Sequence, residues 1–347
     1  MNGIQSLVHG LILMLISGWI LYIGRGVLVP IAFGVVVVYV IVGLAHALRR
    51  VPFLGRSMPI QLRFLLSMSI IIATVTAIAY LVIANRDNVI ALAPQYQKSL
   101  LAIIQQGAVF LRIESEPTWA TLRADLFSQI NLQRLLGSMV VSVSSLVASV
   151  VVVLLYSVFL LIEQRTFAAK IDNISTDPRT VQRIRAATND INQRVGSYMA
   201  LKTFLSVLLG AICWVIMAVF GLEFAAFWAA LITLLNFVPY IGSVLGVLFP
   251  VVMAVVQFEN QHTILWLLLA LTFVQFTIGN LLDPYMMGNS LNLSPFAILA
   301  SLAIWSEIWG IPGAFLAVPI TAVMAIVFSQ FSGTRPIAVM LSRNGQL

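Results

Sequence analysis

The sequence predicts an all-α polytopic integral membrane protein with about eight transmembrane segments. Of its 347 residues, 61% are hydrophobic and 9% are charged, whereas soluble domains carry roughly 25% charged residues. The hydrophobic residues also form runs long enough to cross a bilayer core of roughly 30 Å as helices. The net charge of +7 fits Lys and Arg kept in cytoplasmic loops, so we expect no nucleic-acid partner.

The N-terminal region, residues 1–84, holds three such runs. They cover Leu7–Ile23, Val27–Leu48 and Leu62–Ala84. The short turn at Gly24 predicts that the first two runs form a helical hairpin. Four arginines and no acid lie in the loop between the second and third runs or at the start of the third (Arg49, Arg50, Arg56 and Arg63), so the positive-inside rule places this loop and the N-terminus in the cytoplasm.

Residues 85–136 are predicted to lie outside the cytoplasm, as amphipathic helices at the membrane interface or as a ligand-capturing domain. The fourth span, residues 137–162, carries serines at i, i+4, i+7 and i+11, which form one narrow stripe: Ser138, Ser142, Ser145 and Ser149. Small residues let helices approach closely in lipid. The stripe is therefore interpreted as helix packing, with a subunit interface or a polar pathway as alternatives.

Residues 163–202 are predicted to form an amphipathic cytoplasmic helix that leads into the fifth span. Asp177-Pro178 supplies an N-cap residue and a first helical residue. A seam then recurs at three- and four-residue spacing, at Val181, Ile184, Thr188, Ile191 and Val195. It could pack on the protein's own core, on a second subunit or on the membrane surface, and the sequence leaves that choice open.

The C-terminal region, residues 203–334, contains no Lys or Arg and is the predicted transport core. Two spans, Phe204–Phe220 and Thr263–Leu282, alternate with two broken apolar segments, Phe224–Val256 and Pro295–Phe331. The breaks are made by helix-breaking residues: Pro239 and Gly242 in the first segment, and Gly310, Pro312 and Gly313 in the second. The tail, residues 335–347, is expected to be cytoplasmic.

Each broken segment is interpreted as a re-entrant hairpin or as one tilted, kinked helix. In hydrocarbon, every freed backbone amide or carbonyl must find a partner in protein or in a water-filled cavity, so breaks concentrate where a chain lines a cavity. We favour hairpins, because span plus hairpin then occurs twice with opposite orientation, an inverted repeat typical of transporters. Gly242 and Gly246 also have the spacing of close helix packing.

Six residues in or directly before this region are candidates for binding a solute or ion: Asp283, Glu307, Asn236, Gln275, Asn280 and Lys202. A carboxylate within a membrane is costly, which makes it a functional candidate. On a regular helix, Gln275 and Asp283 share a polar face with Thr272 and Gly279.

Other interpretations of these residues stay open. Asp283 could cap a turn before Pro284 in headgroup water. Glu307 could be a solvated hairpin tip, and Asn236 could satisfy backbone groups freed at a helix end. Lys202 could extend its stem along apolar surface and place its amine at the interface.

Several stretches in this half carry a recognisable pattern: Asn236–Gly246 (NFVPYIGSVLG), Leu282–Gly288 (LDPYMMG) and Trp309–Thr321 (WGIPGAFLAVPIT), preceded by Ser197–Ser206 (SYMALKTFLS). In this order they resemble the autoinducer-2 exporter family, which includes quorum-signal exporters and some Na⁺(Li⁺)/H⁺ antiporters. The N-terminal half is similar only in length and span layout. Asp283 stands where family members frequently carry Glu, and Glu307 is outside the family pattern.

The resemblance implies a bacterial inner-membrane transporter of eight spans that assembles as a homo-oligomer, a pentamer, in the lipid bilayer. We therefore predict a secondary transporter or facilitator that exports a small polar solute such as autoinducer-2. The alternatives are an antiporter that moves a monovalent cation against a proton through intramembrane carboxylates, and a non-transporting membrane scaffold.

An enzyme is disfavoured, because the chain lacks the HExxH, GxSxG and Gly-x-Gly-Asp arrangements. It also lacks a GxxxxGK phosphate loop, which argues against ATP-driven pumping. No cofactor or metal is expected, since His9, His46 and His262 show no ligand spacing.

Overall fold

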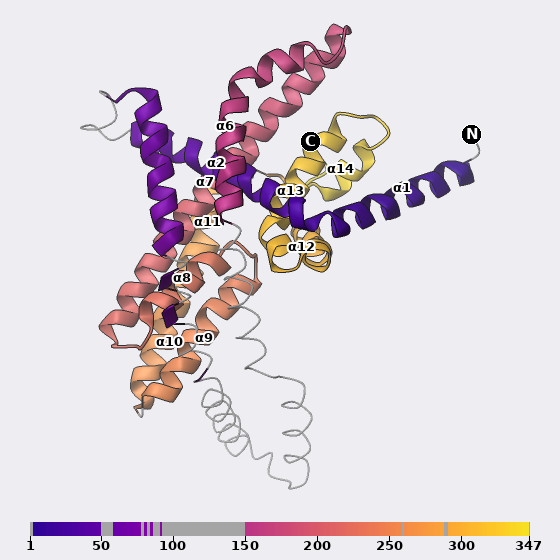
Figure 1. Cartoon of the computed structure of the whole chain (residues 1–347). Helices are drawn as coiled ribbons and strands as arrows, with labels where there is room; N and C mark the ends of the chain where they lie inside the picture. Colours follow the sequence, from indigo (N-terminus) through magenta and orange to yellow (C-terminus); the bar gives the residue numbers. More distant parts are fainter. Residues whose placement is uncertain are drawn as a thin grey trace. The chain divides into compact units, whose positions relative to one another are not determined.

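The structure is a computed structural model built of helices (Figure 1). It describes residues 3–49, 58–77, 80–81, 84–85, 91, 150–258, 260–287 and 291–346. In this part of the chain, five helices are long and apolar enough to cross a membrane, or six if one bent pair is a single span. The protein is therefore a multi-pass membrane protein, and the count of eight stays a prediction. The four serines of the predicted stripe lie outside the described residues.

The described helices fall into two compact units. The first holds α1, α2, α6, the part of α7 up to Phe204, and everything from Pro284 onward. The second holds α7 from Leu205, followed by α8, α9, α10 and a π-helical segment that ends before Asp283. Within the described residues, the chain passes from one unit to the other inside α7 and again between Asp283 and Pro284.

In the first unit, helices α1 (Gly3–Ile23) and α2 (Arg25–Arg49) meet end to end. One residue, Gly24, separates them, and its N–H donates to the Ile20 carbonyl at 2.8 Å, as in a continuing helix. α1 extends away from α2 instead of folding back on it (Figure 1). The predicted hairpin of the first two runs is therefore wrong, because a single helical residue cannot reverse the chain direction.

Helix α2 packs closely on α6 (Val150–Asp172). A Cβ atom on Gly34 would lie 3.0 Å from the Cβ of Tyr156, and the buried Ser157 hydroxyl donates to the Gly34 carbonyl at 3.2 Å. Small residues at such crossings allow the backbones to approach. A further helix, Ile60–Ala77, is long and apolar enough to span the membrane.

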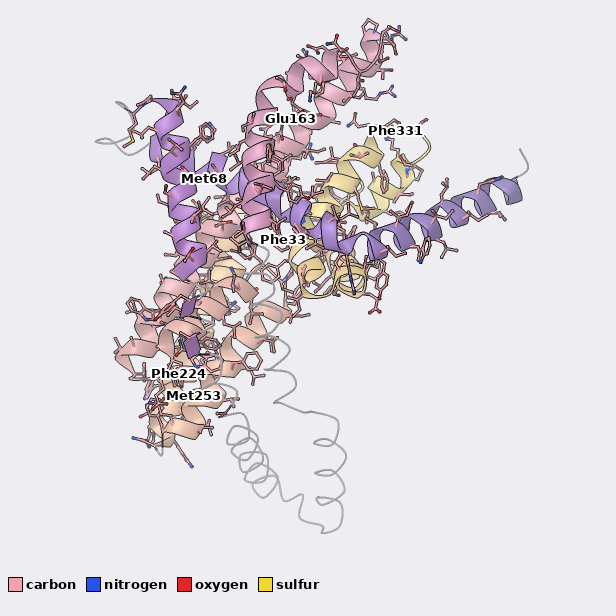
Figure 2. All side chains as sticks on the ribbon, in the orientation of Figure 1. Phe33, Met68, Glu163, Phe224, Met253 and Phe331 are labelled. Carbon is pink, nitrogen blue, oxygen red and sulfur yellow. The ribbon has the colours of Figure 1, made fainter. Side chains whose placement is uncertain are left out.

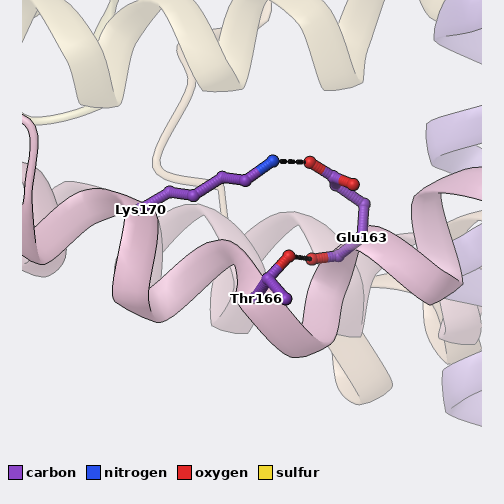
Figure 3. Close-up of polar contacts among 3 residues, drawn as sticks. All are labelled: Glu163, Thr166 and Lys170. Atoms are coloured by element: carbon purple, nitrogen blue, oxygen red, sulfur yellow. Dashed lines mark hydrogen bonds and ion pairs between the residues drawn. The ribbon is translucent and has the colours of Figure 1, made fainter.

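The end of α6 bends by 61° between Gln164 and Thr166. Around this bend the Thr166 hydroxyl donates to the Glu163 carbonyl at 3.1 Å, and the Lys170 amine pairs with the Glu163 carboxylate (Figure 3). Both partners of this ion pair are more than half exposed, so we expect it to add little stability.

Helix α7 (Pro178–Val219) has 42 residues, about 63 Å, twice the thickness of a bilayer core. The predicted amphipathic helix and the fifth span are thus one helix. Asp177 caps it as predicted, since its carboxylate accepts from the amides of Arg179 and Thr180 at 3.1 and 3.2 Å. The bonds from the Thr180 hydroxyl and the Arg179 amide hold the pKa of Asp177 below its ordinary value.

The seam of α7 packs on the protein's own core at its C-terminal end. Val195 joins a buried cluster with Tyr198, Met199, Leu293, Val318 and Ala322, and Ile191 packs beside it. The Tyr39 hydroxyl also bonds to the Asn192 side chain at 2.9 Å, which holds α2 against this stretch of α7.

The remaining helices of the first unit follow Pro284. They are most of α11 (Asp283–Met287), then α12 (Pro295–Trp309), α13 (Ile311–Ser329) and α14 (Arg335–Leu341). The tail returns to the start of α12, where Leu293 and Ser342 form an isolated antiparallel bridge.

The second unit contains the end of α7, then α8 (Ala225–Leu235), α9 (Ile241–Gln257) and α10 (Gln261–Phe276). The π-helix η1 (Thr277–Leu282) continues α10. The core of the second unit is aromatic. The Trp228 ring meets Phe227 edge-on, with 5.0 Å between ring centroids, and stacks on Phe249 at 6.3 Å.

Candidate functional site

The first break, between α8 and α9, satisfies its backbone groups locally. The amides of Phe237 and Val238 donate to Leu234 and Leu235 at 3.2 and 2.8 Å, which tightens the end of α8 into a 3₁₀ turn. Pro239 has no N–H to satisfy. After it, the amides of Ile241 and Gly242 donate to Pro239 and Val238 at 2.6 and 3.0 Å. These hydrogen bonds lower the cost of placing the break in an apolar environment.

The side chain of Asn236 is fixed at this break. It is 7% exposed, and its amide nitrogen donates to the hydroxyl of Ser206 on α7, which is fully buried, at 2.9 Å. The Asn236 side chain is thus bound to another helix rather than to backbone groups of the break. A buried amide and hydroxyl that bond to each other retain further donor and acceptor positions.

Helices α8 and α9 pack side by side and antiparallel. A Cβ atom on Gly242 would lie 1.9 Å from the Leu235 carbonyl oxygen, and one on Gly246 would lie 3.5 Å from the Ile232 side chain. Successive turns of α9 thus meet preceding turns of α8. With 11 residues, about 16 Å, α8 is too short to cross a bilayer core by itself.

The second break, between α12 and α13, is built on Gly310. Its φ of 67° and ψ of −143° fall in a region that only glycine adopts readily. The Gly310 amide donates to Ser306 at 2.8 Å and its carbonyl accepts from Ala314 at 3.1 Å. A Cβ atom on Gly313 would lie 1.8 Å from the Trp305 carbonyl oxygen, so α13 also approaches the preceding helix closely.

The end of α12 is tied to α1. The Trp309 ring N–H donates to the Leu21 carbonyl at 2.9 Å. Leu21 lies in the last turn of α1, where carbonyls have no partner inside the helix. Trp305 packs on Trp309 at 5.1 Å between ring centroids, and both rings are buried.

On α10 and η1, the candidate residues do not share the predicted regular face. Gln275 is buried and Asn280 is exposed. The Asp283 amide donates to the Ile278 carbonyl, five residues back, and such a π-helical turn changes the angular spacing. The face drawn at 100° per residue therefore does not extend to Asp283.

Asp283 itself is half-buried. Its φ of −54° and ψ of −56° are helical, whereas an N-cap residue is typically extended. It therefore lacks the backbone conformation that the capping interpretation requires. Pro284 follows within the helix and has no N–H to donate to a preceding carbonyl.

The structure divides the six candidates between the two units. Asn236, Gln275, Asn280 and Asp283 belong to the second unit, and Lys202 and Glu307 to the first. Lys202 is 8% exposed on α7, and Glu307 is exposed on α12.

Two contributors, Ser206 and Leu21, were missed from the sequence. Ser206 lies 30 residues before its partner, and Leu21 acts through its backbone. Leu21 carries no local sequence signal, and Ser206 ends the stretch SYMALKTFLS without any indication of its partner.

Comparison with known proteins places the chain. The family model described as AI-2E family transporter matches residues 11–333. The AI-2 transport protein TqsA of Escherichia coli is 30% identical over 79% of this chain and 78% of its own length. YhhT of Escherichia coli, provisionally named as a transport protein, is 30% identical over 78% of this chain and 77% of its own length.

A Borreliella burgdorferi protein, also provisionally named as a transport protein, is 35% identical over 56% of this chain. The match spans about half of that relative, 54% of its length. The family match, by contrast, runs through both units and both breaks. The chain belongs to the AI-2E family of transporters.

Proposed function

We propose that this membrane transporter exports a small, uncharged, hydroxylated solute of the autoinducer-2 class across the bacterial inner membrane, with both termini in the cytoplasm. The observation that carries the proposal is the chemistry of the second unit's interior. Among its described residues, the buried polar side chains are Ser206, Asn236 and Gln275, which are all uncharged. Hydroxyl and amide groups both donate and accept hydrogen bonds, as a hydroxylated solute requires.

The name of the TqsA relative supplies the solute class. Cation/proton antiport, by contrast, depends on carboxylates within the membrane. Of the described carboxylates in the C-terminal region, Glu223 and Glu307 are exposed and Asp283 is half-buried. The buried uncharged set therefore favours a neutral solute over a cation.

The test uses proteoliposomes loaded with labelled autoinducer-2. We expect efflux from wild-type vesicles, and an initial rate reduced roughly five-fold by Asn236→Ala, since one lost hydrogen bond is worth about 1 kcal/mol and a ten-fold change corresponds to about 1.4 kcal/mol. Glu223→Gln, which removes an exposed charge, should keep the wild-type rate. Na⁺-dependent dequenching of a trapped pH dye without solute efflux would support antiport, and silence in both assays would support a scaffold.

We also propose that the Asp283 carboxylate is required for transport. We expect Asp283→Asn to abolish most transport at normal expression, because a carboxylate in an apolar helix is retained at a cost. Unchanged efflux in this variant would remove Asp283 from the site while leaving the solute class untouched. Homo-oligomer assembly and the opposite insertion of the two hairpins are kept as parts of the proposal.

A further inference from the structure

The residues that precede α8 and α9 have unusual backbone geometry. Three described residues other than glycine have positive φ; of these, Phe224 directly precedes α8, and Tyr240 directly precedes α9, at the end of the connection that follows α8. Phe224 has a φ of 57° and a ψ of 27°, and it stands at the start of α8 (Figure 2). Bulky residues in this region of backbone space are outliers that store strain.

Tyr240 has the more strained conformation. Its φ of 61° and ψ of −54°, together with the 2.6 Å bond from the Ile241 amide to the Pro239 carbonyl, define the rare form of γ-turn with positive φ. The Tyr240 side chain is 54% exposed, so tight packing of the ring does not account for the conformation.

A buried side chain of α8 makes a second unfavourable contribution to the free energy of the observed state. Trp228 is 1% exposed, and its ring N–H has no hydrogen-bond partner among the described residues. A buried tryptophan N–H normally finds a partner, and leaving it unpaired destabilises the state that buries it.

Specific contacts stabilise the observed position of α8 against the backbone strain and the unpaired ring N–H. The Asn236–Ser206 bond holds the end of α8 to α7, and Gly210 lies so close to α8 that a Cβ atom would be 1.8 Å from the Thr233 hydroxyl. At the other end, the Gln257 side chain accepts from the Glu223 amide and donates to the Gly221 carbonyl, both at 2.8 Å. These contacts hold α8 in place between the strained residues Phe224 and Tyr240.

We propose that α8 moves during the transport cycle. Backbone rotation at Phe224 and Tyr240 allows the movement and releases strain there, so we call these residues the hinges. The Asn236–Ser206 bond restrains the movement, so we call this bond the latch. This rests on the proposed function, because the latch uses groups assigned there to the solute. Release of the latch frees the Asn236 amide and the Ser206 hydroxyl, and rotation at the hinges relieves the strained backbone. A solute that competes for the latch thereby favours the opened state.

The test measures hydrogen–deuterium exchange of the α8–α9 peptides in full-length protein in lipid nanodiscs without solute. Tyr240→Gly removes the strain, so we expect exchange there to slow by roughly ten-fold. Tyr240→Ala keeps a Cβ atom at positive φ and should leave exchange near the wild-type rate. Ser206→Ala removes the latch and should speed exchange.

Asn292→Gly serves as the matched control, because Asn292 is the third positive-φ residue and belongs to the first unit. It should leave α8–α9 exchange unchanged. Equal exchange in Tyr240→Gly and Tyr240→Ala would overturn the hinge, whatever the transport assays give. Failure of wild-type vesicles to release labelled autoinducer-2 would instead overturn the proposed function and leave the exchange result standing.

Discussion

The two broken segments solve one structural problem with different residues. In each, a glycine just past the break approaches a carbonyl of the preceding helix: Gly242 at Leu235, and Gly313 at Trp305. Each break also needs one residue with positive φ. The second break uses Gly310, which adopts it without strain, whereas the first uses Tyr240, which does not.

The use of glycine at one break and tyrosine at the other indicates that the two segments differ in mobility. A glycine at positive φ gives a stable connection, and the Trp309–Leu21 bond fixes it further. A tyrosine at positive φ costs free energy in the state observed, and its neighbour Asn236 is held by a side-chain bond that can be exchanged. We infer that the second segment is the static one of the pair and the first the mobile one.

The largest expected effect comes from filling the close contacts. Gly242→Ala and Gly313→Ala would place a Cβ atom 1.9 and 1.8 Å from backbone oxygen atoms, so each should destabilise the protein by about 3 kcal/mol or more. Thermal unfolding in detergent measures this. Gly279→Ala meets nothing within 4 Å and should be mild, and tolerance of either break variant would show that the breaks are built differently.

The next effect separates strain from crowding at the second break. Gly310→Ala meets no atom within 4 Å, but it forces alanine into glycine-only backbone space. We expect a loss of about 1–3 kcal/mol, read as a lower melting temperature. An unchanged melting temperature would mean that a side chain at positive φ costs little here, and the difference between Gly310 and Tyr240 would then not reflect strain.

A comparable but more local effect is expected at the latch. Asn236→Ala leaves the Ser206 hydroxyl buried without its partner, at a cost of about 1–3 kcal/mol. A double-mutant cycle with Ser206→Ala should give a coupling of about 1 kcal/mol. Ser301→Ala is the matched variant in the second segment, because the Ser301 hydroxyl bonds within its own helix, to Ile298, and its effect should be smaller.

The smallest effect is expected at the tie to α1. Trp309→Phe keeps a packed ring but loses the bond to the Leu21 carbonyl, which contributes about 0.5–1.5 kcal/mol. Trp266→Phe, at a position 63% exposed on α10, controls for the loss of indole surface. Equal melting temperatures for the two variants would mean that this bond does not hold the second segment.

Local sequence signals predicted the parts of the site that depend on residue type. Pro239, Gly242, Gly310, Pro312 and Gly313 were sufficient to locate both breaks, because proline and glycine act on their own backbone. Asp177 identified the start of α7 for the same reason. The end-to-end junction of α1 and α2 was not predicted, because a lone glycine is compatible with a turn and with a continuing helix.

What the sequence by itself determined is the class of protein: a cation-free apolar half with two breaks and a family pattern around them. Tertiary structure decided which partners meet. The bond between Asn236 and Ser206 spans 30 residues, and that between Trp309 and Leu21 spans 288, so neither follows from spacing along one helix. Composition and periodicity describe one helix at a time, whereas the latch, the tie and the strained turn at Tyr240 exist only because separate helices pack together.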